Sequence, residues 1–292
     1  MLRPWFTSAM LAHRHRPIPS FCNPLCMNLI TLSELTPDSV DAIWRLARQP
    51  DKALRGQVAW SFEGNGIRTR TTFIEAFRDL GLAFTELPNL LKTAERACDL
   101  AGYLDPFYDL YVVRESNHQR LAEFAAASCR PVINAMSGAE HPCEVLADAN
   151  YIDSALMPIR DARICLWGPT TNVLRSWHQL AQVLGLPQLH HVCDARLHDE
   201  TLPGVRFASD PPGPMDIVIT DGWPSDADAP GRPLTLADLE SMGHPVLLPT
   251  PPFSIGRELA FDPLLYPRFA GYGQKQLLLP VQKAIIRHLL GA

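Results

Sequence analysis

Residues 57–80 read QVAWSFEGNGIRTRTTFIEAFRDL, and this stretch decides the fold. Residues 57–62 form an apolar run typical of a buried strand, and the glycines at positions 64 and 66 end it. From residue 70 to residue 80, apolar side chains recur at the spacing of one helix face: Phe73, Ala76, Phe77 and Leu80. The stretch therefore predicts a strand, a glycine-containing loop and a helix over residues 70–80, a unit from which parallel sheets are built.

The same alternation of strand and helix runs through the rest of the chain. Further strands are predicted at residues 109–113, 131–134, 162–167, 189–193, 215–220 and 245–248. Helices are predicted from Pro37, behind the cap residue Thr36, and at residues 117–127, 142–156, 172–184, 235–241 and 277–290. The proline-rich stretches 203–233 and 245–267 are interpreted as long loops. We therefore expect an α/β fold of two doubly wound parallel-sheet domains, linked by the helix at 142–156.

Composition and charge narrow the classes of partner. The chain has 292 residues, of which 47% are hydrophobic and 20% are charged, so it can form one large or two medium domains. Because the net charge is -5, neither nucleic acid nor an anionic membrane is predicted as a partner. No apolar run reaches the length of a membrane span. Any anion that the protein binds must be held by local arginines.

Cysteine and histidine usage bears on the compartment and on metals. The seven cysteines form no C-x-x-C pair and are odd in number, which favours reduced thiols and a cytoplasmic location. The ten histidines show no ligand-like spacing, so no metal site is predicted. Residues 1–26 are left as an unassigned N-terminal extension. They carry basic but no acidic residues, which fits an organelle transit segment, although we favour a translation start at Met27.

Polar side chains gather where the predicted strands end. In open parallel sheets, ligands bind beyond the carboxyl ends of the strands. Five strand ends carry such groups, and the first two supply arginines. The side chains concerned are Arg68 and Arg70, then Arg114, His141, Asn172 and Asp221.

The first of these loops is suited to a phosphate. Its glycines let the backbone approach an anion, the following helix start offers free N–H groups, and Arg68 and Arg70 add charge-assisted bonds. Each signal also has a simpler interpretation. The loop can be a surface turn, His141 a capping or packing residue, Asn172 a helix cap and Asp221 a turn residue. No single signal is decisive.

Four segments carry recognisable motifs: residues 62–73 (FEGNGIRTRTTF), 132–148 (VINAMSGAEHPCEVLAD), 168–176 (GPTTNVLRS) and 220–225 (TDGWPS). Together they resemble the ornithine and aspartate carbamoyltransferases, and they are closer to the ornithine branch. Residues 62–73 (FEGNGIRTRTTF) are similar to the family's F-E-K-P-S-T-R-T-R-x-S-F loop, and residues 132–148 (VINAMSGAEHPCEVLAD) to V-I-N-x-x-x-x-x-x-H-P-C-Q-x-L-A-D. Residues 168–176 (GPTTNVLRS) are similar to G-D-x-N-N-V-x-x-S, and residues 220–225 (TDGWPS) to T-D-V-W-x-S. The resemblance covers nearly everything from Met27 onward.

The resemblance implies an enzyme that moves the carbamoyl group of carbamoyl phosphate to the amino group of a small acceptor, with no cofactor. It implies a carbamoyl-phosphate-binding domain over residues 27–150 and an acceptor-binding domain over residues 151–270. It further implies that residues 271–292 form a C-terminal helix that packs back on the first domain. The implied partners are the two reactants and, since the family forms trimers, further copies of the chain in a homotrimer.

The resemblance also implies roles for individual residues. His141 and Arg114 would be catalytic, because both would stabilise the negative charge that grows on the carbamoyl oxygen during attack. Carbamoyl phosphate would be bound by Gly66, Ile67, Arg68, Thr69, Arg114, His141 and Glu144. The acceptor would be bound by Asn172, Asp221, Ser225 and Thr250.

The chain departs from the family pattern at the site itself. The family's Lys, Pro, Ser and Thr of the phosphate loop are here residues 64–67 (GNGI), so two hydroxyl donors are missing. The glutamine after H-P-C is Glu144, the H-C-L-P segment is residues 249–252 (PTPP), and an arginine of the last helix is replaced near Leu278. We therefore expect an ornithine-like or other, unusual amine acceptor in a specialised biosynthetic pathway.

Two other functions remain as alternatives. A non-catalytic carbamoyltransferase-like binding protein would account for the altered phosphate loop, although the retained arginines and His141 argue against it. A nucleotide-binding oxidoreductase on a similar fold is the other alternative, but residues 168–171 (GPTT) lack the glycine spacing of a dinucleotide loop.

Overall fold

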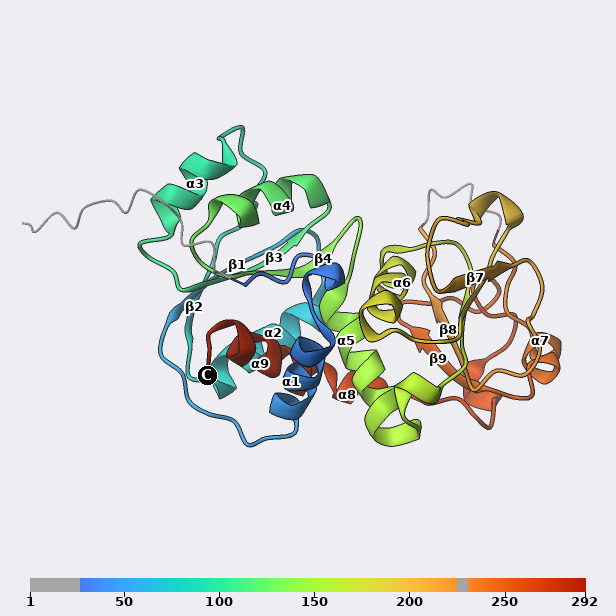
Figure 1. Ribbon diagram of the computed structural model, residues 1–292. Coiled ribbons are helices and arrows are strands. Elements are labelled where there is room, and N and C mark those ends of the chain that lie inside the picture. Colours follow the sequence, from blue (N-terminus) through green and yellow to red (C-terminus); the bar gives the residue numbers. More distant parts are fainter. Residues whose placement is uncertain (1–26, 225–230) are drawn as a thin grey trace, which may run out of the picture.

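Two parallel β-sheets form the two lobes of the molecule (Figure 1). The computed structural model describes residues 27–224 and 231–292. The first sheet has the order β2-β1-β3-β4 and contains β1 (Gln57–Phe62), β2 (Ala83–Glu86), β3 (Leu110–Glu115) and β4 (Val132–Ser137). The second sheet has the order β7-β6-β5-β8-β9 and contains β5 (Ile164–Trp167), β6 (Leu189–Val192), β7 (Val205–Ala208), β8 (Ile217–Asp221) and β9 (Val246–Thr250). The strands of both sheets pair in parallel, so the predicted α/β class is confirmed.

Helices cover both faces of the first sheet. Successive residues of a strand point to opposite faces, and in β1 Val58 and Trp60 enter one apolar core while Ala59 enters another. The first core includes α1 (Pro37–Ala47), α2 (Ile67–Asp79) and α9 (Leu278–Leu289). The second core includes α3 (Ala97–Leu104) and α4 (His118–Ala127), which lie together on one side of the sheet in Figure 1. This is the doubly wound arrangement that the alternation predicts.

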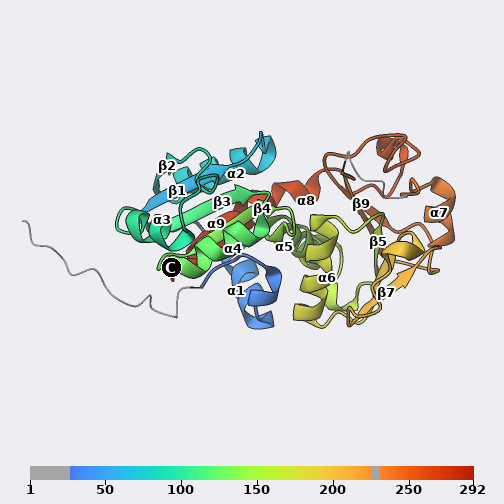
Figure 2. The ribbon, with the colours of Figure 1, turned by 90° about the horizontal axis from the view of Figure 1, so that it is seen from above.

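The lobes share α5 (Pro142–Tyr151), which lies between the two sheets in Figures 1 and 2. Every residue from Pro142 to Asn150 is buried, because α5 contacts β4, α6 (Asn172–Leu184), α8 (Gly273–Gln276) and α9. One continuous apolar core runs from α1 and α9 through α5 to α6 and the second sheet. On the outer face of that sheet, α7 (Leu236–Ser241) contributes Leu239 to a separate core.

Short helical turns connect these elements. They lie at Leu32–Glu34, Ile152–Leu156, Ile159–Asp161, Ala195–Leu197 and Pro263–Leu265. The final helix, α9, packs on α1 and α2, so the C-terminal segment returns to the first lobe. At the other end of the described chain, Thr36 caps α1 as predicted, since its hydroxyl accepts from the Ser39 N–H at 3.2 Å.

Some elements differ from the prediction. The sequence pattern misses β2, β7, α3 and α8. β2 and β7 are edge strands whose residues are mostly exposed or half-buried, so they lack the apolar run that marks a strand, and β7 lies inside the stretch 203–233 interpreted as a loop. α2 begins at Ile67 rather than at residue 70. The cap of α6 is Thr171, whose hydroxyl accepts from the Leu174 N–H at 3.2 Å, so the interpretation of Asn172 as the cap is wrong.

Two further predictions concern compartment and membrane. The thiols of Cys98, Cys143, Cys165 and Cys193 are free, whereas Cys129 is disulfide-bonded, which contradicts the prediction of reduced thiols at that residue. Over residues 27–224 and 231–292, no helix is long and apolar enough to cross a bilayer.

Candidate active site

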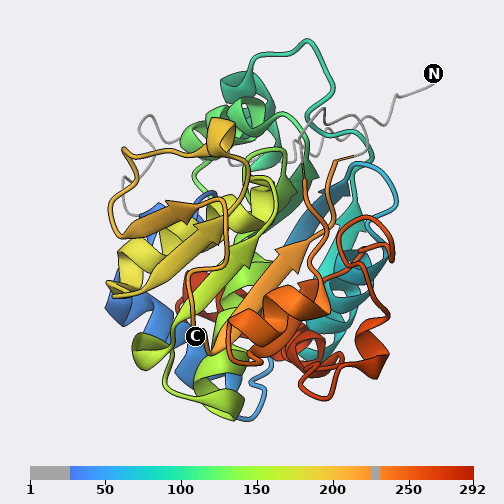
Figure 3. The same ribbon diagram turned by 90° about the vertical axis from the view of Figure 1, so that its right-hand side faces the viewer.

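The predicted site residues come from strand ends in both lobes. Arg68 follows β1, Arg114 lies within β3 rather than just after it, and His141 follows β4. In the second lobe, Asp221 and Thr250 are the last residues of β8 and β9. Figure 3, viewed from the side of the second lobe, shows that lobe in yellow to orange in front of the blue and green elements of the first. The site therefore lies where the two lobes face each other.

The phosphate loop ends in a helix start that has no side-chain cap. Gly66 is the N-cap of α2, in a left-handed conformation with φ 45°. A Cβ atom at Gly66 would lie 3.2 Å from Nη1 and 3.3 Å from Cδ of Arg114, so the missing side chain lets the loop lie against that arginine. The first N–H groups of a helix have no intrahelical acceptor and favour an anion. The first turn of α2 contains Ile67, Arg68 and Thr69, which are predicted to bind carbamoyl phosphate. It therefore starts directly beside the guanidinium of Arg114.

Arg70 has a different role from the one suggested by the sequence. Its Nη1 lies 2.7 Å from Glu86 Oε1, and its Nε donates to the Asn65 carbonyl at 3.3 Å. Its guanidinium also stacks 4.8 Å from the centre of the Trp60 ring. These contacts turn Arg70 back onto the first sheet, where it holds the phosphate loop in place.

The two remaining arginines face the same space. Nη2 of Arg68 donates to the Pro251 carbonyl of the second lobe at 3.1 Å. Arg114 is half-buried, and a register shift of the β3–β4 pairing lies between Val113 and Arg114, a feature that re-aims side chains. Burial and the neighbouring charge of Arg68 lower the pKa of Arg114. An anion between the two guanidinium groups would relieve this repulsion.

His141 is a neutral imidazole at the start of α5. It stands at the N-cap position, as the simpler interpretation expected, and its backbone N–H donates to Ser176 Oγ at 2.9 Å, but its side chain makes no capping hydrogen bond. Burial lowers the pKa of His141 to about 4, and the charges of Arg114 and Arg68 act in the same direction. Its Nδ1 is buried and, over the described chain, has no hydrogen-bond partner. The ring is therefore uncharged at neutral pH and lies within electrostatic range of both arginines.

Glu144 forms part of a buried ion cluster that the sequence did not predict. Lys275 of α8 donates to Glu144 and also to both carboxylate oxygens of Asp148, at 2.8 and 3.0 Å. Burial favours the protonated form of Glu144, but Lys275 outweighs it and lowers the pKa. Burial raises the pKa of Asp148 to about 6, although Lys275 opposes it. The carboxylate of Glu144 is thus compensated by Lys275 and is not a free negative charge.

A signal for Lys275 was present in the sequence. Glu144 replaces a neutral glutamine in a helix with buried neighbours, and the arginine expected near Leu278 is absent. A buried carboxylate needs a cation. Lys275 lies one helical turn before Leu278 and supplies that cation from a different position.

Of the residues predicted to bind the acceptor, the structure brings Asp221 and Thr250 together. They are register partners at the ends of β8 and β9. Both are buried, and burial raises the pKa of Asp221 to about 7, although a hydrogen bond from Thr171 opposes the shift. The side chain of Thr250 interacts with the carboxylate of Asp148 and lowers its pKa. A carboxyl group that titrates near neutrality therefore lies beside the strand end that carries this hydroxyl.

Asn172 is less available than the sequence suggested. Its Nδ2 donates to the Ser137 carbonyl at 2.8 Å, and its Oδ1 accepts from the Val173 N–H at 2.9 Å. It thus joins α6 to the end of β4. Ser225 lies outside the described residues. Over residues 27–224 and 231–292, no cluster of three His, Cys, Asp or Glu side chains could hold a metal ion.

Comparison with known proteins agrees with this arrangement. Residues 27–154 match the family model "Aspartate/ornithine carbamoyltransferase, carbamoyl-P binding domain". The chain is 29% identical over 269 residues to an ornithine carbamoyltransferase of Rhodopseudomonas palustris, covering 83% of this chain and 86% of the relative. It is 32% identical over 202 residues to one of Bradyrhizobium diazoefficiens, covering 64% and 66%.

Solved structures show the same fold. The ornithine carbamoyltransferase of Pyrococcus furiosus superposes with a TM-score of 0.82 at 22% identity, covering 91% of this chain and 98% of that one. The enzyme of Thermus thermophilus superposes with a TM-score of 0.79 at 24% identity, covering 90% and 98%. Together with the motifs at the strand ends, these matches establish that the chain belongs to the aspartate/ornithine carbamoyltransferase family.

Proposed function

We propose that this protein transfers the carbamoyl group of carbamoyl phosphate to the amino group of a small, ornithine-like or other amine acceptor. The observation that carries this proposal is the meeting of three groups from separate strand ends: Arg68, Arg114 and the neutral His141. Two cations beside a helix start suit a phosphate, and an uncharged imidazole can polarise a carbonyl without repelling them. The family to which the chain belongs uses the same donor.

In the proposed reaction, the phosphate of the donor lies at the first turn of α2, between Arg68 and Arg114. The carbamoyl oxygen faces Arg114 and His141, which stabilise the charge that develops on it. The neutral amine attacks the carbonyl carbon, a C–N bond forms, and the C–O bond to phosphate breaks. The departing phosphate takes the amine proton, so no covalent enzyme intermediate is needed.

We assign the acceptor to the second lobe. Asp221 and Thr250, with Asn172 and Ser225, are the groups that would orient its polar end. Thr250 stands where the family has a thiol, and one of the two side-chain N–H groups of Asn172 is bound to Ser137, which leaves the other for an acceptor. These differences support an acceptor other than ornithine itself. A panel of amines is therefore needed to identify it.

The experiment incubates the purified protein with carbamoyl phosphate and that panel, and measures ureido product and phosphate release. Arg68→Ala should weaken donor binding about 10- to 150-fold, since a hydrogen bond to a charged group contributes about 1.5–3 kcal/mol. The matched control is Arg78→Ala, because Arg78 lies on the same helix and its ion pair among the described residues is with Glu75 on the surface, at 2.6 Å. Absence of turnover with every amine, together with no thermal shift by carbamoyl phosphate, rejects the proposal. Binding of the donor without turnover favours the non-catalytic alternative.

Three further assignments are part of the proposal. Residues 27–150 bind the donor, residues 151–270 bind the acceptor, and residues 271–292 pack back on the first domain; the contacts of α9 with α1 and α2 support the last assignment. We also propose a homotrimer, which sedimentation of the purified chain tests. We also propose the cytoplasm as the compartment, on the four free thiols and against the disulfide at Cys129, and fractionation of cells that express a tagged chain tests it.

A further inference from the structure

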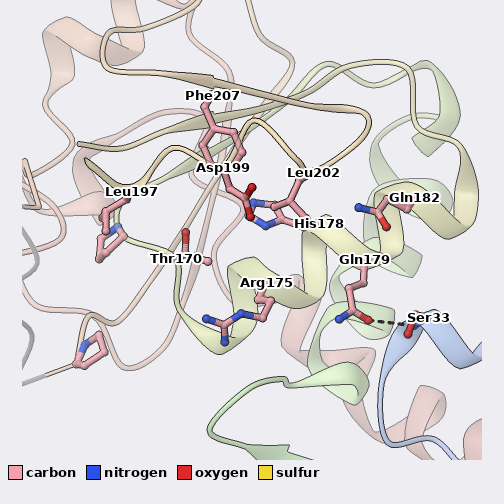
Figure 4. Close-up of a pocket in the computed structure, with 12 residues that line it drawn as sticks. Ser33, Thr170, Arg175, His178, Gln179, Gln182, Leu197, Asp199, Leu202 and Phe207 are labelled. Carbon is pink, nitrogen blue, oxygen red and sulfur yellow. Dashed lines mark hydrogen bonds between the residues drawn. The ribbon is translucent and has the colours of Figure 1, made fainter. Parts of the chain in front are cut away.

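A cleft of about 610 Å³ lies along one face of α6, in the second lobe (Figure 4). Its volume falls in the range of about 300–1,000 Å³ that is usual for small-molecule sites. Of the described residues, none that we assign to carbamoyl phosphate or to the amine acceptor lines this cleft. The lining residues that matter here are Arg175, His178, Leu197, Asp199, Leu202 and Phe207.

A chain of hydrogen bonds fixes the protons of two buried histidines beside this cleft. The Gly168 carbonyl can only accept, so Nε2 of His191 donates to it, at 2.8 Å. The Nδ1 of His191 then carries a lone pair and accepts from Nε2 of His178, at 3.0 Å. The Nδ1 of His178 is therefore left as an unprotonated acceptor. Burial lowers the pKa of His178 to about 3 and that of His191 to about 4, so both rings stay neutral.

The acceptor atom of His178 is unsatisfied. The residue is 1% exposed, and in the part of the chain that the structure describes its Nδ1 has no hydrogen-bond partner. Nearly all buried polar atoms in proteins are paired with protein, water or ligand. Because His178 also lines the cleft, a molecule bound there can supply the missing donor.

A second acceptor faces His178. Figure 4 shows the carboxylate of Asp199 beside the His178 ring, and the two side chains interact electrostatically. Asp199 Oδ1 accepts from the side chain of Thr201 and from its N–H, at 2.5 and 3.0 Å, which lowers the pKa of Asp199 and keeps it ionised. A cationic group with several N–H donors would form hydrogen bonds with both Nδ1 of His178 and the carboxylate of Asp199. A primary ammonium has these properties.

The rest of the cleft adds a cation and an apolar wall. Arg175 is exposed, and one of its N–H groups donates to the Ala139 carbonyl at 2.9 Å, so the guanidinium is held at the rim. A carboxylate is its natural partner. The apolar wall of the cleft is formed by the side chains of Leu197, Leu202 and Phe207.

We propose that this cleft binds a small α-amino acid with an apolar side chain. Its ammonium lies between His178 and Asp199, its carboxylate lies at Arg175, and its side chain packs on the apolar wall. A single water molecule would also satisfy His178, but only an amino acid would use the exposed charges of Asp199 and Arg175 together with the apolar wall. The cleft reaches Thr170 and Pro224, near the proposed acceptor residues Asn172 and Ser225 in the sequence, but Asn172, Asp221 and Thr250 do not line it.

Isothermal titration of the full chain with L-leucine tests the proposal. 3-Methylbutylamine, which lacks the carboxylate, and 4-methylpentanoate, which lacks the amine, should both bind more weakly. Asp199→Asn and Arg175→Gln should each raise the Kd for L-leucine about tenfold or more, because each removes a charged partner. The matched controls are Asp210→Asn and Arg206→Gln, two exposed charges of the same lobe that do not line the cleft. Asp221→Asn should leave the Kd unchanged, which separates this cleft from the acceptor site.

Nitrogen-15 NMR of the histidine rings gives a readout that does not depend on variants. The Nδ1 of His178 should be unprotonated in the free protein, and its resonance should move when L-leucine is added. Absence of L-leucine binding overturns the proposal. So does a Kd that neither Asp199→Asn nor Arg175→Gln changes, or a proton found on Nδ1 of His178 in the free protein.

Discussion

Replacing Lys275 by methionine should destabilise the protein strongly, although it keeps the shape of the side chain. Lys275 is the cation between Glu144 and Asp148, which are 7% and 1% exposed. Without it, two carboxylates remain in a site that water does not reach. Removing one partner of a buried ion pair costs about 3–5 kcal/mol, because the other charge stays buried and unpaired. We expect Lys275→Met to lower the free energy of unfolding by about that amount.

Lys283→Met is the matched control. Lys283 also contacts two carboxylates, Asp51 and Asp79, at 2.6 and 3.0 Å, and it lies on the neighbouring helix α9. Its partners are 38% and 40% exposed, so water can solvate them once the lysine is gone. Exposed pairs contribute about 0–1 kcal/mol. The two variants thus remove the same group from similar geometry and differ mainly in burial.

Urea unfolding followed by circular dichroism measures both variants against the parent. A triple variant isolates the cause: Lys275→Met combined with Glu144→Gln and Asp148→Asn should recover much of the lost stability, since no unpaired charge is left. If Lys275→Met costs no more than Lys283→Met, or if neutralising both carboxylates restores nothing, the reasoning about burial is refuted.

Three further outcomes follow from the site. Gly66→Ala should weaken carbamoyl phosphate binding about tenfold or more, because a Cβ would press on Arg114 at a left-handed backbone position; unchanged affinity by titration would contradict the contact. Burial raises the pKa of Asp221 from 3.8 to about 7, so the folded state loses stability as pH rises through that window. Asp221→Asn should therefore gain more stability over the parent at about pH 8 than at about pH 5, measured by urea unfolding, and an equal gain would argue against the shift. Burial lowers the pKa of His141 from 6.5 to about 4, so the parent should lose stability as pH falls through that window while His141→Gln loses less; parallel stability curves would count against a buried neutral ring.

The predictable parts of the fold are those with a strong local pattern. The bounds of α6 were predicted to the residue, because its apolar face repeats over 13 residues and Gly185 ends it in a left-handed conformation. β2 and β7 lie at sheet edges and bury little, so their sequences contain no strand signal. What makes them strands is pairing with β1 and β6, which a local window does not contain.

The candidate site also contains some residues that the sequence predicts and some contacts that it does not. Arg68, Arg114, His141 and Asp221 could be found because parallel strands bring their carboxyl ends to one edge of each sheet. The contact of Lys275 with Glu144 joins residues 131 positions apart, through a helix of four residues, and no spacing rule predicts it. Likewise, the motif at Asn172 does not indicate that its amide is bonded to Ser137.

The bond from Arg68 to the Pro251 carbonyl has a kinetic consequence. The guanidinium that we assign to the phosphate also donates one of its N–H groups to the opposite lobe. An anion that accepted from the same N–H group would release the loop that follows Thr250, the last residue of β9. The two reactants should therefore enter in a compulsory sequence, the anion first and the amine second.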